Sequence, residues 1–467
     1  MKQRLRGQHY LIVGNWLIQV FILLLFIFFQ GPFTPHGGVS LRLSPEEMAR
    51  TFGAGDSGSY LHAALDLVAN GHNTIDWAWV LNLWPPGMVW LDAAIIRFSP
   101  LDFGVSIGLI TALVWSVPLA LLSRPFMHKR KTALIVLLVE LAVLGTSPFQ
   151  SWMFDEGLFY ADGIAVALLL LALSLIVNRV RSGGAVRVWV RDGVYVGIAF
   201  AAALYFRAAF QLVPWALAGL AITISVVVLV KRIRRKSSGD LGRQALLLMV
   251  AALVVPILTQ PYTAYLQQDR ARTQFVMLDD IVYVGIWRHN TTPASPDWAI
   301  RGGMSIGCDI DEAKCASIQQ QEADGRVFTS VELRNALILS IAHHPFQFLG
   351  NRGSYLARQW SADEWGSYSS SNNLNPGQGL LYLMSLIAAI VAACILVVRG
   401  RWALLVIPIL AVALLAPFAV VHVEVRYLIP LKTIGLLTPI LMLMLKETPR
   451  RPRRARSVIE SSPSAES

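Results

Sequence analysis

Residues 380–398 read LLYLMSLIAAIVAACILVV, an apolar run without a single charged side chain. A helix needs about 20 such residues to cross the roughly 30 Å hydrocarbon core of a bilayer. Similar runs recur at residues 21–29, 165–177, 222–230 and 434–445. Hydrophobic residues make up 55% of the sequence and charged residues only 15%, whereas soluble domains carry roughly 25% charged residues. This segregation into long apolar blocks predicts a membrane protein.

About ten segments have the character of transmembrane helices, which predicts an all-α polytopic membrane protein. They lie near residues 9–30, 102–122, 132–148, 158–177, 193–206, 210–230, 243–259, 377–398, 402–420 and 427–446. The first lacks a small-residue cleavage site, so we expect an uncleaved helix. Residues 84–98 are apolar but too short to cross comfortably. We interpret them as a juxtamembrane helix that starts after Pro85 and Pro86 and lies against the outer leaflet.

Basic residues indicate how these helices are oriented. The net charge of +11 comes mainly from clusters that abut the apolar blocks, within residues 2–6, 124–131, 179–191, 231–243 and 446–456. Membrane proteins keep such clusters on the cytoplasmic side. Both termini are therefore predicted to be cytoplasmic, and the loops that hold most acidic residues extracytoplasmic. The aromatic and basic interleaving of a nucleic-acid groove is missing, which argues against a nucleic-acid partner.

Composition divides the chain into four parts. Residues 1–259 are expected to form an N-terminal transmembrane module, with a first outer loop at 31–101 that contains juxtamembrane helices. Residues 260–376 predict a small, mostly helical extracytoplasmic subdomain. Residues 377–446 supply the last transmembrane helices. Residues 447–467 are rich in Arg, Ser and Pro, which predicts a disordered cytoplasmic tail.

Two cysteines flank a polar stretch in the predicted outer subdomain. Cys308 and Cys315 enclose the sequence Asp-Ile-Asp-Glu-Ala-Lys. An oxidising compartment favours a disulfide between them. A metal clip through Asp309, Asp311 and Glu312 is the weaker alternative, because calcium sites need more ligands at looser spacing.

Asp56 begins an amphipathic stretch in the first outer loop. Tyr60, Ala64 and Leu67 recur there at helical spacing, so Asp56 occupies the position of an N-cap. The alternative to this structural role is chemical, because a carboxylate held at the membrane surface can act as a general base.

A second acidic group stands at the mouth of the 158–177 helix. Its members are Asp155, Glu156 and Asp162. Carboxylates beside a membrane face are costly to bury, so we expect them to be solvated, paired or bound to a cation. Asp162 directly precedes a long apolar run and is the better functional candidate, whereas Glu156 fits a plain polar loop.

Two arginines lie at predicted outer helix ends, where the charge distribution disfavours basic residues. Arg207 falls between two spans with almost no loop, and Arg426 begins the last span, with Lys432 further along it. A lipid phosphate would explain both arginines, because guanidinium groups match phosphate oxygens. The alternatives are pairing with Glu424 or the acidic group, or contact with anionic headgroups. The role of Lys432 stays open.

Further candidates have a structural interpretation. Trp77, Trp79, Trp84 and Trp152 predict an interfacial belt, with a platform for lipid or sugar as the alternative. Glu140 lies inside a predicted span, where we expect a hydrogen bond to a neighbouring helix.

Four stretches, taken in order, resemble the C-type (GT-C) polyprenyl-phosphate-sugar-dependent glycosyltransferases, which include protein O-mannosyltransferases and lipid A aminoarabinose transferases. They are Gly55-Asp56 with Tyr60, Ala64 and Gly71, followed by Trp84-Pro85-Pro86-Gly87; Asp162 before a Leu- and Ala-rich helix; Phe206-Arg207 with Pro214; and Glu424-Val-Arg426-Tyr427 with Pro430. Each motif is short. Their order and their common outer location, over roughly residues 50–440, carry the resemblance.

The resemblance implies an inverting transferase in a bacterial cell (inner) membrane. A sugar would pass from a polyprenyl-phosphate donor to a cell-envelope glycolipid, polysaccharide or protein on the outer face. Asp56 matches the first-loop acid that serves as base, and Asp162 resembles the second-loop acid. Arg207 and Arg426 resemble donor-phosphate contacts, a set to which we add Lys432. The expected supporting residues are Asp155, Glu156, His422, Glu424 and Tyr427.

Two questions stay open beside the resemblance. The first-loop acid of this family is often paired with another acidic residue, whereas Ser57 follows Asp56 here. The sequence is therefore compatible with no cofactor or with a divalent cation, Mg²⁺ or Mn²⁺. The alternative functions are an O-antigen polymerase or ligase with a lipid-pyrophosphate donor, which leaves Asp56 unexplained, and a lipid or solute transporter, which should have charges near the membrane midplane.

Overall fold

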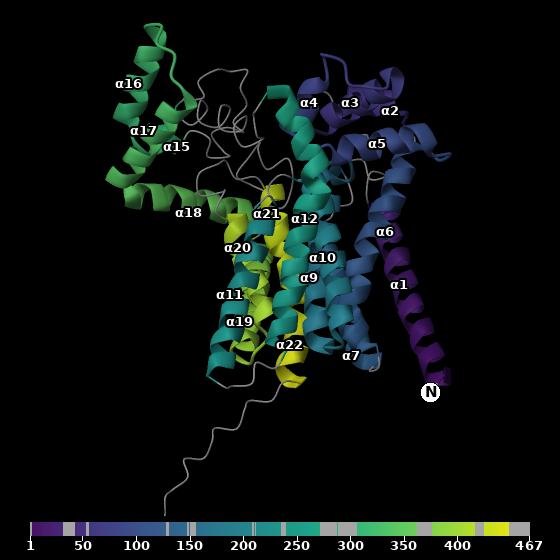
Figure 1. The fold of residues 1–467 in the computed structure, drawn as a ribbon. Coiled ribbons are helices and arrows are strands. Elements are labelled where there is room, and N and C mark those ends of the chain that lie inside the picture. Colours follow the sequence, from purple (N-terminus) through teal and green to yellow (C-terminus); the bar gives the residue numbers. More distant parts are fainter. Residues whose placement is uncertain are drawn as a thin grey trace, which may run out of the picture.

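The computed structural model describes residues 2–30, 43–52, 56–127, 130–146, 149, 156–207, 210, 212–234, 240–270, 287, 306–361, 376–415 and 425–447. Within these residues all regular secondary structure is helical (Figure 1). The predicted all-α class is confirmed.

Seven helical stretches are long and apolar enough to cross a membrane in the described part of the chain. They comprise Phe103–Phe126 with α6 (Phe103–Ser123), α9 (Ala161–Ser182), α10 (Val186–Phe206), α11 (Val213–Ile233), residues Leu241–Pro261 of α12 (Leu241–Arg270), α19 (Pro376–Val398), and Leu428–Glu447, which joins α21 (Val425–Ile434), η8 (Gly435–Leu437) and α22 (Thr438–Glu447). The chain is therefore a polytopic membrane protein.

The three other predicted spans also contain helices. They are α1 (Lys2–Gln30), α7 (Arg130–Leu144), and η6 (Trp402–Leu405) followed by α20 (Val406–Leu415). Several spans are longer than predicted. Helix α1 begins at Lys2 rather than near residue 9, and α10 begins at Val186 rather than near residue 193. Helix α12 continues to Arg270 rather than ending near residue 259, because the polar residues after Pro261 are still compatible with a helix although they are too polar for a bilayer.

The described residues of the first predicted outer loop form four helices, namely α2 (Pro45–Phe52), α3 (Asp56–Asn70), α4 (Ala78–Leu83) and α5 (Gly87–Phe98). Helix α5 begins directly after Pro85 and Pro86, as predicted, because proline is well suited to the start of a helix. Figure 1 shows α5 lying across one end of the helix bundle, with α2, α3 and α4 beyond it. We call this end of the bundle the loop side.

The second large loop lies at the same end of the bundle and contains α15 (Ile306–Ile310), α16 (Glu312–Ala323), α17 (Ser330–His343) and α18 (Pro345–Ser361) (Figure 1). Its interior is a small hydrophobic cluster around Trp287, Leu333 and Leu337. A separate and much larger cluster runs from Leu23 to Met444 and includes residues of the first and last membrane helices. The transmembrane helices from both ends of the sequence therefore share one core.

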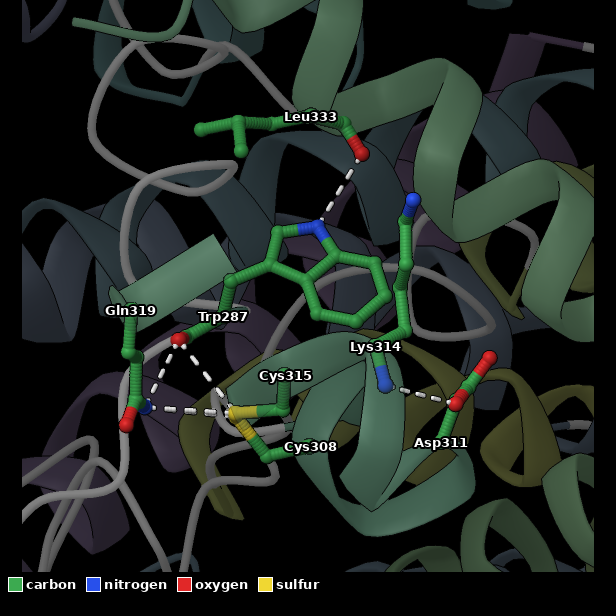
Figure 2. The surroundings of a disulfide bond; sticks show 7 residues. All are labelled: Trp287, Cys308, Asp311, Lys314, Cys315, Gln319 and Leu333. Atoms are coloured by element: carbon green, nitrogen blue, oxygen red, sulfur yellow. Dashed lines mark hydrogen bonds between the residues drawn. A yellow bond between two sulfur atoms is a disulfide. The ribbon is translucent and has the colours of Figure 1, made fainter. Parts of the chain in front are cut away.

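Cys308 and Cys315 form the predicted disulfide (Figure 2). Asp311, which lies between them, caps α16 by accepting a hydrogen bond from the backbone N–H of Lys314 at 2.9 Å, and it also accepts one from the Ser340 hydroxyl at 2.8 Å. Partial burial raises the pKa of Asp311, but the two hydrogen bonds act in the opposite direction, and the pKa is lowered overall. The structure therefore shows a disulfide rather than a metal clip between the two cysteines, and Asp311 acts as a helix cap.

Candidate active site

Asp162 and Arg207 form an ion pair on the loop side of the bundle. Asp162 lies in the first turn of α9, and Arg207 is the extended residue that ends α10. The guanidinium Nη1 of Arg207 donates a hydrogen bond to Oδ2 of Asp162 at 2.9 Å. The Asp162 side chain is 3% exposed and the Arg207 side chain 19% exposed. Arg207 therefore pairs with a member of the acidic group, which was one of the alternatives for this arginine. The hydrogen bond from Arg207 to Asp162 holds the guanidinium in one orientation.

Aromatic contacts join the segments that carry the two candidate acids. Phe52 ends α2, four residues before Asp56, and its ring centroid lies 5.0 Å from that of Phe159. Phe159 ends η3 (Glu156–Phe159), three residues before Asp162. The chain segment leading to Asp56 therefore lies against the segment leading to Asp162.

The motif Trp84-Pro85-Pro86-Gly87 connects α3 with the end of α10. The Trp84 ring lies edge-on to Tyr60, one turn after Asp56, at a centroid distance of 5.4 Å. At the other end of the motif, a Cβ atom added to Gly87 would overlap the carbonyl oxygen of Tyr205 and lie 2.8 Å from its carbonyl carbon. Only glycine permits this approach, which packs the start of α5 against the residues immediately before Arg207.

These four contacts link the chain segments around the candidate site to one another. Helix α3 contacts Trp84, Gly87 contacts Tyr205, Arg207 pairs with Asp162, and Phe159 contacts Phe52 just before Asp56. Three of the four stretches that carry the family resemblance therefore converge on the loop side. Asp56 itself opens α3 with a partly exposed side chain.

Lys432 occupies a different environment from the one expected for a surface phosphate contact. It lies in α21, which packs against α9, and is 1% exposed. Its Nζ atom lies 5.0 Å from the ring centroid of Tyr382 and 5.7 Å from that of Trp360. The Tyr382 hydroxyl is hydrogen-bonded to the hydroxyl of Thr146. The ammonium group is thus enclosed by aromatic faces, which attract cations, and neither aromatic residue carried a sequence signal for this role.

Several predicted site residues lie beyond what the structure describes. Asp155, His422 and Glu424 fall outside the described residues. Glu156 belongs to η3, and Arg426 and Tyr427 belong to α21, but the side chains of all three fall outside the description. Within the described residues no group of three or more His, Cys, Asp or Glu side chains is arranged to hold a metal ion. The predicted roles of these residues and of a divalent cation stay predictions.

Besides Asp162, the buried carboxyl groups in the described part of the chain belong to Asp92, Glu140 and Asp192, and Asp192 is paired with Arg179 and Arg191. Glu140 accepts a hydrogen bond from Gln19 of α1 at 2.9 Å, which confirms the predicted contact with a neighbouring helix. Asp92 of α5 is 2% exposed, and its Oδ1 accepts no hydrogen bond from any described residue. Burial raises the pKa of Asp92 well above its usual range. Sequence reasoning missed Asp92, although its position inside the apolar segment 84–98 was a signal.

Comparisons with known proteins give two similar structures. No protein-family model and no curated protein matches the sequence. The archaeal oligosaccharyltransferase AglB from Archaeoglobus fulgidus, in complex with an inhibitory peptide and a dolichol-phosphate, is similar at a TM-score of 0.45 and 13% identity over 94% of this chain, which spans 50% of AglB. ArnT from Cupriavidus metallidurans, bound to undecaprenyl phosphate, is similar at a TM-score of 0.37 and 14% identity, with 94% of this chain and 78% of ArnT covered. Both proteins are GT-C glycosyltransferases.

Proposed function

We propose that this protein transfers a sugar from a polyprenyl-phosphate donor to a cell-envelope acceptor on the extracytoplasmic face of a bacterial inner membrane, with inversion at the sugar carbon. One observation carries the proposal. The contacts described above link the segments that carry Asp56, Asp162 and Arg207 at one end of a membrane-helix bundle, which supports a shared site. A base and a phosphate-binding cation beside a bilayer are what transfer from a lipid-linked phosphate requires.

The mechanism needs one base and stabilisation of the leaving group. An acceptor hydroxyl attacks the anomeric carbon while the bond from that carbon to the phosphate oxygen breaks. Asp56 takes the hydroxyl proton, since its side chain is partly exposed at the start of α3. The polyprenyl phosphate leaves with the bonding electron pair and needs no general acid. Arg207 and Arg426 are assigned to the charge that develops on the departing phosphate.

Asp162 has a positioning role in this scheme. A carboxylate at hydrogen-bond distance fixes one edge of the Arg207 guanidinium. Fixing the arginine before the donor binds reduces the reorganisation that would otherwise accompany charge transfer to the phosphate. Lys432, buried among aromatic rings in α21, which packs against α9, is proposed to add positive charge near the donor phosphate. Sugar transfer measured with EDTA and with added Mg²⁺ or Mn²⁺ shows whether a divalent cation binds the donor phosphate in the reaction.

The orientation follows from the charge distribution. Lys231 and Arg232 lie in the last turn of α11, at the end of the bundle opposite the loop side, and Lys446 lies in the last turn of α22 at the same end (Figure 1). Basic clusters face the cytoplasm. The loop side would then be extracytoplasmic, in a compartment that favours the disulfide between Cys308 and Cys315.

The test is sugar transfer by purified protein in nanodiscs. Labelled polyprenyl-phosphate sugars and a cell-envelope acceptor extract are supplied to the wild type and to Asp56→Asn, which keeps the shape of the side chain but removes the base. We expect transfer to fall by about 10²-fold or more in this variant. Asp102→Asn is the matched control, because Asp102 is exposed and its side chain does not cap α6.

Three outcomes would overturn the proposal. Full activity in Asp56→Asn removes Asp56 from the role of base. Transfer from pyrophosphate-linked donors alone assigns the protein to the polymerases and ligases. Movement of an intact lipid across the nanodisc or vesicle membrane, with no transfer of sugar, assigns it to the transporters.

A further inference from the structure

An aromatic cluster extends away from the candidate site along the first loop. It comprises Tyr60, His62, Trp77, Trp79 and Trp84. The rings follow one another at centroid distances of 4.6 Å for His62 and Trp77, 6.5 Å for Trp77 and Trp79, 5.4 Å for Trp79 and Trp84, and 5.4 Å for Trp84 and Tyr60. Since Tyr60 lies one turn after Asp56 on α3, the cluster is continuous with the candidate site.

The cluster consists of one exposed indole that contacts partly buried aromatic rings. Trp77 and Trp84 are partly buried and pack against the main hydrophobic core. Trp79, between them, is 40% exposed. The imidazole of His62 is stacked on Trp77 with an angle of 9° between the ring planes. Trp79 therefore presents an exposed indole that packs against partly buried rings, and an aromatic face held in this way is suited to stacking on a flat ligand.

The position of the cluster argues against the interfacial belt. Figure 1 shows α3 and α4 on the far side of α5 from the transmembrane helices. Trp79 belongs to α4, so it lies beyond the helix that covers the end of the bundle. The tryptophans of a belt lie at the level of the lipid headgroups. Helix α4, which carries Trp79, instead lies on the loop side, from which an acceptor would come in the proposed orientation (Figure 1).

The charge of the surrounding chain selects the ligand. Residues 56–90 contain no Lys or Arg, whereas they contain Asp56, Asp66 and Asp76. Helix α2, which packs against α3, adds Arg50 but also Glu46 and Glu47, so the first-loop helices carry a net negative charge that disfavours anionic headgroups and phosphorylated ligands. The C–H face of a sugar ring packs on an indole, while the sugar hydroxyls form hydrogen bonds with polar groups. Two polar residues lie beside the tryptophans: His62 is stacked on Trp77, and Asp76 directly precedes Trp77 in the sequence.

We infer that Trp79, supported by Trp77 and Trp84, forms a subsite for a neutral glycan chain. This inference rests on the proposed function, for which it names the acceptor as a polysaccharide or glycan rather than a peptide. The glycan lies over the exposed indole of Trp79, and its end is directed toward Asp56 on the neighbouring helix α3.

Binding to soluble glycans tests the subsite without the transfer reaction. Wild-type protein in nanodiscs is probed with oligosaccharides derived from mannan, arabinan, galactan and glucan, and the strongest interaction is measured by calorimetry. We expect Trp79→Ala to weaken this binding about tenfold or more, because the loss of one stacked aromatic contact and its buried area is of that size. Trp79→Phe should retain most of the affinity.

Trp215→Ala is the matched control. Trp215 is 78% exposed on α11, in a different part of the bundle, so its replacement should leave glycan binding unchanged. Thermal unfolding of all variants shows whether they are folded. If the wild type binds none of the four oligosaccharide classes, or if folded Trp79→Ala binds as well as the wild type, the inference is wrong. If the wild type binds phosphatidylglycerol vesicles more tightly than Trp79→Ala does, the cluster binds lipid and the inference is wrong.

Transfer assays separate this inference from the proposed function. With the glycan that binds, Trp79→Ala should raise KM for the acceptor and leave kcat nearly unchanged, whereas Asp56→Asn lowers kcat. Absence of transfer in the wild type contradicts the proposed function, even where glycan binding depends on Trp79. Normal transfer with an acceptor KM that is unchanged in Trp79→Ala contradicts the inference alone.

Discussion

At the scale of single residues, the main finding is that two residues with separate predicted roles are partners. Asp162 and Arg207 are 45 positions apart and meet at 2.9 Å. A nearly buried carboxylate and a mostly buried guanidinium stabilise each other, and either one alone would leave an uncompensated charge. Asp162 is therefore indirectly essential to the proposed reaction, through the arginine that it orients.

Asp162→Asn should destabilise the protein by about 2–3 kcal/mol, a value below that of a fully buried pair because Arg207 is 19% exposed. Its transfer activity should also fall. The measurement is a double-mutant cycle of thermal unfolding with Arg207→Gln. We expect the double variant to be less destabilised than the sum of the single changes. Strict additivity would mean that the pair does not form in the membrane.

Asp92 predicts a pH dependence of stability. Burial raises its pKa, so the folded protein holds a proton that the unfolded chain releases above the ordinary value of about 3.9. The contribution of Asp92 is fully favourable below that value. It is lost as the pH rises toward the folded pKa, by about 1.4 kcal/mol for each pH unit in that interval. Asp92→Asn should flatten this dependence.

Unfolding temperatures of wild type and Asp92→Asn across acidic and neutral pH check this prediction. The variant should be the more stable protein at neutral pH, because an amide needs no proton to stay neutral. Parallel pH profiles for the two proteins would show that Asp92 is not buried as a carboxylic acid. Asp102→Asn, at an exposed site, should follow the wild type.

At the scale of elements, the position of α5 decides the geometry around Arg207. The start of α5 contacts the last turn of α10 at Gly87, and Trp90 of α5 lies 5.7 Å from the ring centroid of Tyr205. Tyr205 also donates a hydrogen bond from its hydroxyl to the carbonyl of Leu258 in α12. The juxtamembrane helix is thus fixed to two membrane helices immediately beside the candidate site.

Gly87→Ala should push α5 away from α10, because a methyl group would overlap backbone atoms of Tyr205 that cannot rotate away. We expect a loss of stability of about 1–3 kcal/mol and reduced transfer. Gly219→Ala is the control, since a Cβ at Gly219 of α11 meets nothing within 4 Å. Equal unfolding temperatures for Gly87→Ala and the wild type would contradict the close approach.

At the scale of the whole molecule, both large loops lie at one end of the bundle (Figure 1). The disulfide of the second loop therefore reports on which side of the membrane the candidate site lies. In the proposed orientation, both cysteines face an oxidising compartment and are joined before any reagent is added.

An impermeant maleimide applied to intact spheroplasts should label neither Cys308 nor Cys315 at first and both after mild reduction. Cys394, a free cysteine within α19, serves as the internal control and should stay unlabelled from either side. Labelling of Cys308 or Cys315 only after the membrane is opened would reverse the proposed orientation. Labelling without reductant would show that the bond is not formed in the cell.

The sequence by itself determined the membrane class, the positions of the helices, the start of α5 and the cysteine pair. Each of these depends on a short stretch of chain, since partition of about 20 apolar residues into a bilayer is a local property. Only the tertiary structure decided that Arg207 meets Asp162, that Trp360 and Tyr382 enclose Lys432, and that Asp92 is buried. These outcomes depend on how helices distant in sequence pack, and helix packing leaves no periodic signature in any one of them.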